Sequence, residues 1–163
     1  MPQKHGIVGT FHITTNAHGK IPWCIWPGVP EILIDNLVMT RNLHQAKLCA
    51  FCIMPDHVHL ILYPGEKGLA KFMKSWKQNS SRDIGILYPR SSDSRVAAPD
   101  QIQFSGWQKG YYDELINDTR QRTAAMNYVM FNPLKHHLVE NMDHWPWTSY
   151  HFQELVDPLD DWS

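Results

Sequence analysis

Residues 54–62 read Met-Pro-Asp-His-Val-His-Leu-Ile-Leu, and this stretch decides how the rest of the chain is interpreted. Its polar and apolar residues alternate, and Pro55 with Asp56 marks a turn just before it, which is typical of a β-strand. Side chains at positions i and i+2 share one face of a strand, so we expect His57 and His59 side by side. Two neutral imidazoles on one face form part of a metal site, although two solvated histidines would give the same pattern.

The residues on either side of this strand predict an α+β fold. We expect strands at residues 6–15, 47–54 and 57–63, a strand-like segment at 103–107 followed by Tyr111 and Tyr112, and helices at 30–46, 68–83 and 118–132. This order, β-α-β-β-α-β and then a helix, is the ferredoxin-like (RRM-like) arrangement. In it an antiparallel sheet has its helices packed on one face, here with an added C-terminal tyrosine helix and an aromatic tail. Residues 89–100 are polar and rich in turn formers, and they predict a loop.

A second group of candidate site residues lies in the helix predicted just before Pro133. Proline disfavours helical geometry at the preceding residue, so the helix is expected to end there. Tyr128 and Asn132 are four residues apart and therefore share one face of this helix. A phenol can act as a nucleophile, and an amide oxygen can bind a hard metal ion. The alternative is that Tyr128 is an ordinary core residue whose hydroxyl is hydrogen-bonded.

Charge is balanced over the whole chain but uneven along it. The 15 Lys+Arg and 16 Asp+Glu residues give a formal net charge of −1, whereas nucleic-acid-binding proteins are more often basic. The helix predicted at 68–83 has an apolar stripe, and lysines follow its opposite face: Lys67, Lys71, Lys74 and Lys77. A solvated helix face explains these lysines without DNA. Because they directly follow the histidine strand, we expect them to contact DNA phosphates.

The remaining composition predicts one domain in the cytoplasm. The 163 residues contain no run approaching the roughly 20 apolar residues that a membrane span needs, and no secretory signal of the usual kind. We expect a single domain over residues 1–163, with a core at about 5–133 and a packed tail at about 134–163. The three cysteines cannot all pair with one another, which fits reduced thiols. Cys49 and Cys52 are three positions apart in a strand, so they are expected on opposite faces as packing residues.

Four blocks of this sequence, in order, resemble the HUH single-strand DNA transposases (IS200-like), and more narrowly the REP-associated tyrosine transposases of bacteria. The blocks are Gly-Thr-Phe-His-Ile-Thr-Thr at 9–15, Met-Pro-Asp-His-Val-His-Leu at 54–60, Trp-Gln-Lys-Gly-Tyr-Tyr-Asp at 107–113, and Asn-Tyr-Val-Met-Phe-Asn-Pro-Leu-Lys at 127–135 with Trp-Pro-Trp-Thr-Ser-Tyr at 145–150. The second and fourth blocks are the specific ones. The resemblance implies the same sheet and the same chemistry.

The family's functional residues fall on named positions of this chain. In that family two histidines bind a divalent metal, and a tyrosine attacks a DNA phosphate; by position these are His57, His59 and Tyr128. The amide one turn after the tyrosine falls on Asn132, the implied third ligand. Where the family usually has Asn before the first histidine, this chain has Asp56, which adds a negative charge near the metal. The implied cofactor is Mg²⁺ or Mn²⁺.

The resemblance implies metal-dependent cleavage and rejoining of single-stranded DNA through a 5′-phosphotyrosine intermediate. The implied partner is single-stranded DNA with a hairpin, including palindromic repeats, and the protein acts as a monomer or a homodimer. Trp107 and Tyr111 could stack on unpaired bases or equally pack in the core. Two other functions stay open: a non-catalytic hairpin-binding protein of the same fold, and a small metal-dependent phosphodiesterase that uses water. A plasmid-type nickase uses similar chemistry, but the Asn-Pro after Tyr128 and the short chain favour the transposases.

Overall fold

The sheet has four antiparallel strands in the computed structural model, which describes residues 9–89 and 102–158. The strands are β1 (Thr10–Asn16), β2 (Lys47–Ile53), β3 (His57–Tyr63) and β4 (Tyr112–Ile116). Their order across the sheet is β2-β3-β1-β4, so the strand with the two histidines lies beside the first strand of the chain. This is the ferredoxin-like order, and the predicted fold class is confirmed.

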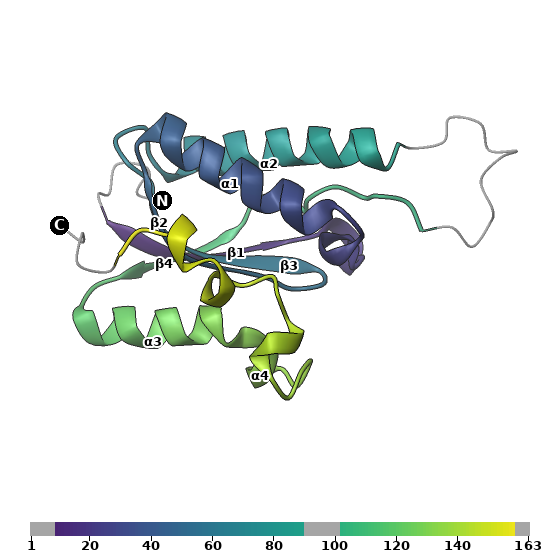
Figure 1. The fold of residues 1–163 in the computed structure, drawn as a ribbon. Coiled ribbons are helices and arrows are strands. Elements are labelled where there is room, and N and C mark those ends of the chain that lie inside the picture. The colour runs from purple at the N-terminus through teal and green to yellow at the C-terminus, as the bar shows by residue number, and fades with distance from the viewer. Residues whose placement is uncertain (1–8, 90–101, 159–163) are drawn as a thin grey trace, which may run out of the picture.

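Two helices cover one face of the sheet, as the sequence predicted (Figure 1). They are α1 (Val29–His44) and α2 (Leu69–Leu87). The apolar stripe of α2 is buried at every expected position: Leu69, Phe72, Met73 and Trp76. These side chains join the larger hydrophobic core between the two helices and the sheet. No helix in the described ranges is both long and apolar enough to cross a membrane.

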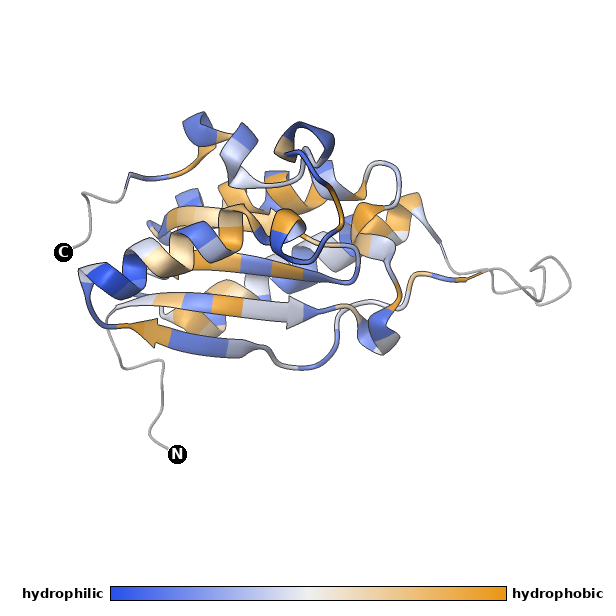
Figure 2. Ribbon diagram, turned by 90° about the horizontal axis from the view of Figure 1, so that it is seen from below, coloured by the Kyte–Doolittle hydropathy of each residue, from blue (hydrophilic) through white to orange (hydrophobic). Residues whose placement is uncertain are grey.

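The tyrosine helix, α3 (Thr119–Met130), lies on the opposite face of the sheet (Figure 1). Asp118 caps its first turn, because its carboxylate accepts a hydrogen bond from the amide of Gln121 at 2.8 Å. A short helix, α4 (Asn132–Lys135), follows directly. Figure 2, seen from below, shows hydrophilic and hydrophobic residues interleaved along the strands. A smaller hydrophobic core lies between α3 and the sheet and covers part of this face. The polar residues on the rest of the face border a cavity.

The position of the fourth strand was predicted wrongly. Residues 103–107 do not form a strand, and the pairing with β1 is made instead by β4. Gly106 has a φ of 76°, which interrupts extended backbone, and Trp107 forms only an isolated bridge with Ala17. The predicted loop at 89–100, apart from Pro89, and the first part of the strand predicted at 6–15 lie outside the described residues.

The prediction for the two strand cysteines was also wrong. A β-bulge shifts the register of β2 between Leu48 and Ala50. The bulge adds a residue to one strand and resets the alternation, so that Cys49 and Cys52 both pack in the core under α3. Both are buried free thiols, and burial raises the pKa of Cys52 well above its ordinary value. Their role as packing residues is unchanged.

The segment after α4 returns to the sheet and follows β2. The amide of Ile53 donates to the carbonyl of Trp147 at 2.8 Å, and the amide of Phe51 donates to Ser149 Oγ at 3.0 Å. At the other end of β2, Leu48 and Asp157 exchange two hydrogen bonds of 2.7 Å each. This segment covers the polar backbone edge that β2 would otherwise expose.

Candidate functional site

His57 and His59 share the face of β3 that α3 partly covers. Their rings are perpendicular, with centroids 4.9 Å apart. His57 Nδ1 lies 2.7 Å from a carboxylate oxygen of Asp56. An ionised carboxylate only accepts hydrogen bonds, so this contact favours the tautomer of the neutral ring that has its proton on Nδ1 and a free lone pair on Nε2. Asp56 therefore orients the ring of His57.

His59 is the more buried of the pair, with 4% of its surface exposed. Its Nδ1 lies 3.1 Å from Nε2 of His12 and 3.0 Å from Oγ1 of Thr14, both on the neighbouring strand. Burial, together with the nearby His57 and His12 rings, lowers the pKa of His59 to about 3. The ring is therefore neutral near pH 7, and the neutral imidazole is the form that binds metal ions. Its Nδ1 is engaged, so Nε2 is the nitrogen left for a ligand.

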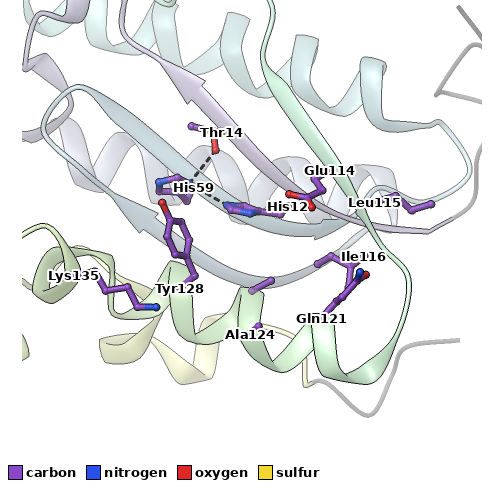
Figure 3. Close-up of a pocket in the computed structure, with 11 residues that line it drawn as sticks. His12, Thr14, His59, Glu114, Leu115, Ile116, Gln121, Ala124, Tyr128 and Lys135 are labelled. Atoms are coloured by element: carbon purple, nitrogen blue, oxygen red, sulfur yellow. Dashed lines mark hydrogen bonds between the residues drawn. The ribbon is translucent and has the colours of Figure 1, made fainter.

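Tyr128 reaches His59 and His12 from α3. Its ring lies edge-on to His59, with centroids 5.5 Å apart, and 5.7 Å from the ring of His12. Figure 3 shows the hydroxyl end of Tyr128 directed toward His59. Lys135 Nζ lies 5.2 Å from the centroid of the Tyr128 ring. These side chains border a cavity of about 590 Å³ between the sheet and α3, and its wall is completed by Glu114, Leu115, Ile116, Gln121, Ala124 and Ala125.

Asn132 is fully buried at the start of α4, so it lies just outside α3, which carries Tyr128, and not on the same helix as the sequence predicted. Its Nδ2 donates to the backbone carbonyl of Tyr128 at 3.3 Å, while its Oδ1 has no hydrogen-bond partner among the described residues. A buried acceptor without a partner costs about 1–3 kcal/mol, and a bound cation would remove that cost. The unpaired Oδ1 of Asn132 is therefore consistent with a role as a metal ligand.

The donor atoms suit a hard divalent cation. Among residues 9–89 and 102–158, no three His, Cys, Asp or Glu side chains stand close enough to hold a metal ion. Asn132 Oδ1, an amide oxygen, is a candidate ligand of another type. Two imidazole nitrogens and one amide oxygen fit Mn²⁺ well and accept Mg²⁺. The predicted ligand set of His57, His59 and Asn132 thus agrees with the chemistry of the donors.

Sequence reasoning missed three residues that border this site. His12 and Thr14 alternate along β1 as the two histidines do along β3, which is the signal that could have found them. The alternation along β1 shows that His12 and Thr14 share one face, but it does not show which strand lies next to β1. The register that pairs Thr14 with His59 is known only from the fold. Lys135 lies seven residues after Tyr128, about two helical turns on.

The predicted DNA-binding lysines do not lie with these residues. Three of them, Lys67, Lys71 and Lys74, border a shallow hollow of about 360 Å³ on the outer side of α2. The sheet separates that surface from α3 (Figure 1). Lys77 is placed differently, because its Nζ donates to the carbonyls of Gln108 at 3.0 Å and Gly110 at 2.6 Å. Burial lowers the pKa of Lys77. The structure gives this lysine a bracing role in the loop before β4.

The two aromatic residues considered for base stacking are packed into the protein. Trp107 lies against Trp23 and Trp76, with ring centroids 4.7 Å and 5.1 Å away, and its Nε1 donates to Ser80 Oγ at 3.2 Å. Tyr111 is partly buried against the same core. Trp107 and Tyr111 therefore pack against the core, which is the alternative to base stacking that the sequence left open.

Comparison with known proteins places this chain among transposases. The family described as "Transposase IS200 like" matches residues 31–132, which run from α1 to Asn132. A Haemophilus influenzae protein assigned to the REP-associated tyrosine transposases is 30% identical over 112 residues, which span 63% of this chain and 57% of that protein. The REP-associated tyrosine transposase of Escherichia coli is 21% identical over 145 residues, 88% of this chain and 77% of that protein.

A solved structure shares the fold. The structure of a REP-associated tyrosine transposase bound to a REP hairpin superposes with a TM-score of 0.71, covering 96% of this chain and 87% of that one. The sequences are 18% identical, so this likeness shows the fold alone.

Proposed function

Because this chain belongs to the family of IS200-like transposases, as its motifs predicted, we propose that it is a REP-associated tyrosine transposase. It cleaves and rejoins single-stranded or hairpin DNA through a 5′-phosphotyrosine intermediate. The observation that carries this proposal is the position of Tyr128, whose ring meets His59 at 5.5 Å inside a cavity of about 590 Å³. Tyr128 lines this cavity together with His12 and His59, so its hydroxyl is accessible to a bound phosphate, whereas His57 and Asn132 are not among the residues that line it.

Tyr128 is the nucleophile in this proposal. Its hydroxyl oxygen forms a bond to the scissile phosphorus while the bond from phosphorus to the 3′-oxygen breaks. The hydroxyl of Tyr128 loses one proton and the departing 3′-oxygen gains one, so no proton is consumed overall. The phosphodiester is exchanged rather than hydrolysed, and the reverse attack by a 3′-hydroxyl rejoins DNA. Lys135, whose Nζ lies 5.2 Å from the centroid of the Tyr128 ring, adds a positive charge to the wall of the cavity in which the phosphate would bind.

The histidines and Asn132 orient the phosphate. His57 and His59, through Nε2, and Asn132, through Oδ1, would hold Mg²⁺ or Mn²⁺, which when bound polarises the phosphate oxygens as a Lewis acid. Asp56 fixes the ring of His57, and Thr14 with His12 fixes the ring of His59. These contacts set the direction of each Nε2 before substrate arrives, which is the preorganisation that catalysis requires.

We propose hairpin DNA as the partner, since a relative of the same fold is bound to a REP hairpin. Lys67, Lys71 and Lys74 bind phosphates of the hairpin without regard to sequence. Their place on the outer side of α2 means that they contribute to affinity and not to the chemical step. Lys77 is left out of this surface because its ammonium is held by two backbone carbonyls.

Covalent attachment of DNA tests the proposal. The protein is incubated with Mn²⁺ and end-labelled hairpin DNA that carries single-stranded flanks and was selected for binding to the Tyr128→Phe variant. Wild-type protein is expected to give an adduct that survives denaturation, and Tyr128→Phe is expected to give none. Tyr150→Phe is the matched control, because Tyr150 is exposed and does not line the cavity, and it should retain the adduct. Cleavage without an adduct would support a hydrolase that uses water, and binding without cleavage would support a non-catalytic protein.

A further inference from the structure

The loop between Trp107 and β4 encloses a second, smaller cavity. It has a volume of about 240 Å³, and its lining residues are Asn16, Gln108, Lys109, Gly110, Tyr111 and Tyr112. A single planar ring system fits a space of this size, whereas a duplex does not. The loop also carries a positive charge, since Lys109 is exposed.

The register of the sheet places this cavity on the catalytic face. Tyr112 pairs with Thr14, which in turn pairs with His59. Directly paired residues share one face of a sheet, so Tyr112 and His59 lie on the same face two strands apart, about 10 Å across it. Asn16 pairs with His57 and faces the same way. The small cavity therefore lies beside the larger one that contains Tyr128.

Tyr112 is exposed although its neighbours are not. It has 67% of its surface accessible, whereas Tyr111 and Trp107 pack against the core. Its ring therefore contributes little to the hydrophobic core and is free to contact a ligand. An aromatic face on an open sheet surface is the feature on which unpaired bases stack.

The loop is held in shape before any ligand binds. Lys77 donates to the carbonyls of Gln108 and Gly110, and the amide of Gln108 donates to the carbonyl of Asn16 at 2.8 Å. Gly110 has a φ of 80°, a conformation that residues with a side chain rarely adopt. A preformed loop avoids the entropic cost of ordering on binding.

We propose that this cavity binds one unpaired nucleotide next to the cleaved phosphate. The base stacks on Tyr112, the amide of Asn16 hydrogen-bonds its polar edge, and Lys109 pairs with its phosphate. This site rests on the proposed function, because it takes the strand that Tyr128 cleaves. It also gives a function to the hydrogen bonds by which Lys77 of α2 holds this loop in place.

The test uses 2-aminopurine, a fluorescent base that stacking quenches. The probe is the selected hairpin with 2-aminopurine at each unpaired position in turn, and the same hairpin without its single-stranded flanks serves as a control. Both are bound to Tyr128→Phe protein, which keeps the probe intact. Quenching is expected at one position, retained when Tyr112→Phe is added and lost with Tyr112→Leu. Affinity for the flanked hairpin should fall about 5- to 150-fold with Tyr112→Leu, and affinity for the bare hairpin should not change.

Each outcome decides between the site and its alternatives. No quenching at any position, or an equal loss of affinity for flanked and bare hairpins, would overturn the nucleotide site. Tyr112 is exposed, so Tyr112→Leu is expected to fold normally, and its thermal unfolding curve checks this. The wild-type adduct assay reports separately on the proposed function: an adduct without position-specific quenching overturns the nucleotide site alone, and quenching without an adduct overturns the transposase chemistry alone.

Discussion

The rings of Tyr128 and His59 meet edge to face, 5.5 Å apart at an interplanar angle of 84°. Tyr128 comes from a helix on the α3 side of the sheet, and His59 comes from a central strand. Their contact joins the two sequence motifs that are most specific to the family. We infer that a buried neutral imidazole lies beside a phenol in an open cavity because both side chains act on one DNA phosphate.

His57→Ala and His59→Ala should each abolish DNA cleavage. The two variants should differ in stability, because His57 is only partly buried whereas His59 is buried and hydrogen-bonded to Thr14 and His12. We expect His59→Ala to cost about 1–3 kcal/mol of unfolding free energy and His57→Ala less. Cleavage assays with Mn²⁺ and denaturant unfolding measure both quantities. Normal cleavage by either variant would remove the histidine pair from the metal site.

Asn132→Leu should separate metal binding from folding. The substitution removes a buried oxygen that has no partner in the described structure, so the metal-free variant should be at least as stable as wild type. Wild-type protein should gain thermal stability as Mn²⁺ is added, because an ion that binds only the folded state stabilises it. The variant should gain much less. An equal gain in both proteins would show that Asn132 is not a ligand, and His57→Ala provides the control for loss of a ligand at a less buried position.

Acid should destabilise the metal-free protein through His59. The folded protein holds the pKa of this ring at about 3, below its ordinary value of 6.5. The unfolded chain therefore binds a proton at His59 as the pH falls below about 6.5, while the folded protein does not until about 3. The contribution of His59 to the free energy of unfolding is therefore fully present above about pH 6.5. It is lost as the pH falls from about 6.5 to about 3, at up to about 1.4 kcal/mol per pH unit. Denaturant unfolding over this range should show a shallower loss for His59→Gln; equal slopes would contradict the assignment.

Replacing Lys67, Lys71 and Lys74 together with Ala should lower affinity for every hairpin alike. It should also flatten the dependence of log K on log salt by roughly 2 to 3 units, at about 0.7 to 0.9 per lost contact. The lysines border α2 and Tyr128 belongs to α3, and the sheet separates these two helices (Figure 1), so the rate of adduct formation at saturating DNA should not change. Lys135→Ala is the opposite control: it should slow that rate and change the salt dependence by one contact or less. An unchanged slope in the triple variant would make the lysines an ordinary solvated helix face.

The parts of this fold that depend on local pattern could be predicted from sequence. The alternation around His57 and His59 indicated the strand, and the stripe through Phe72 and Trp76 indicated α2. Pro133 indicated an end of the tyrosine helix at residue 132, whereas α3 ends at Met130 and Pro133 lies inside α4. The position of β4 could not be predicted, because Gly106 interrupts a segment that has strand-like composition.

The environment of the site depends on long-range pairing, which no local pattern reports. The register that sets Thr14 against His59 links residues 45 positions apart, and only the fold brings them together. The face on which α3 packs is likewise set by its contacts with Cys52 and Ile61 rather than by its own sequence. The bulge in β2, which places Cys49 and Cys52 on one face, is a local irregularity without a sequence signal of its own.

The identity of the residue that carries the DNA tests the role of Tyr128 most directly. Trypsin releases Tyr128 on the peptide 123–135, which follows Arg122 and ends at Lys135, whereas Tyr111 and Tyr112 leave together on the peptide 110–120. The wild-type adduct formed with Mn²⁺ and hairpin DNA is digested with trypsin and nuclease and measured by mass spectrometry. We expect a nucleotide phosphate on the 123–135 peptide and none on 110–120. A modified 110–120 peptide, or a modification on neither, would contradict the assignment of Tyr128 as the nucleophile.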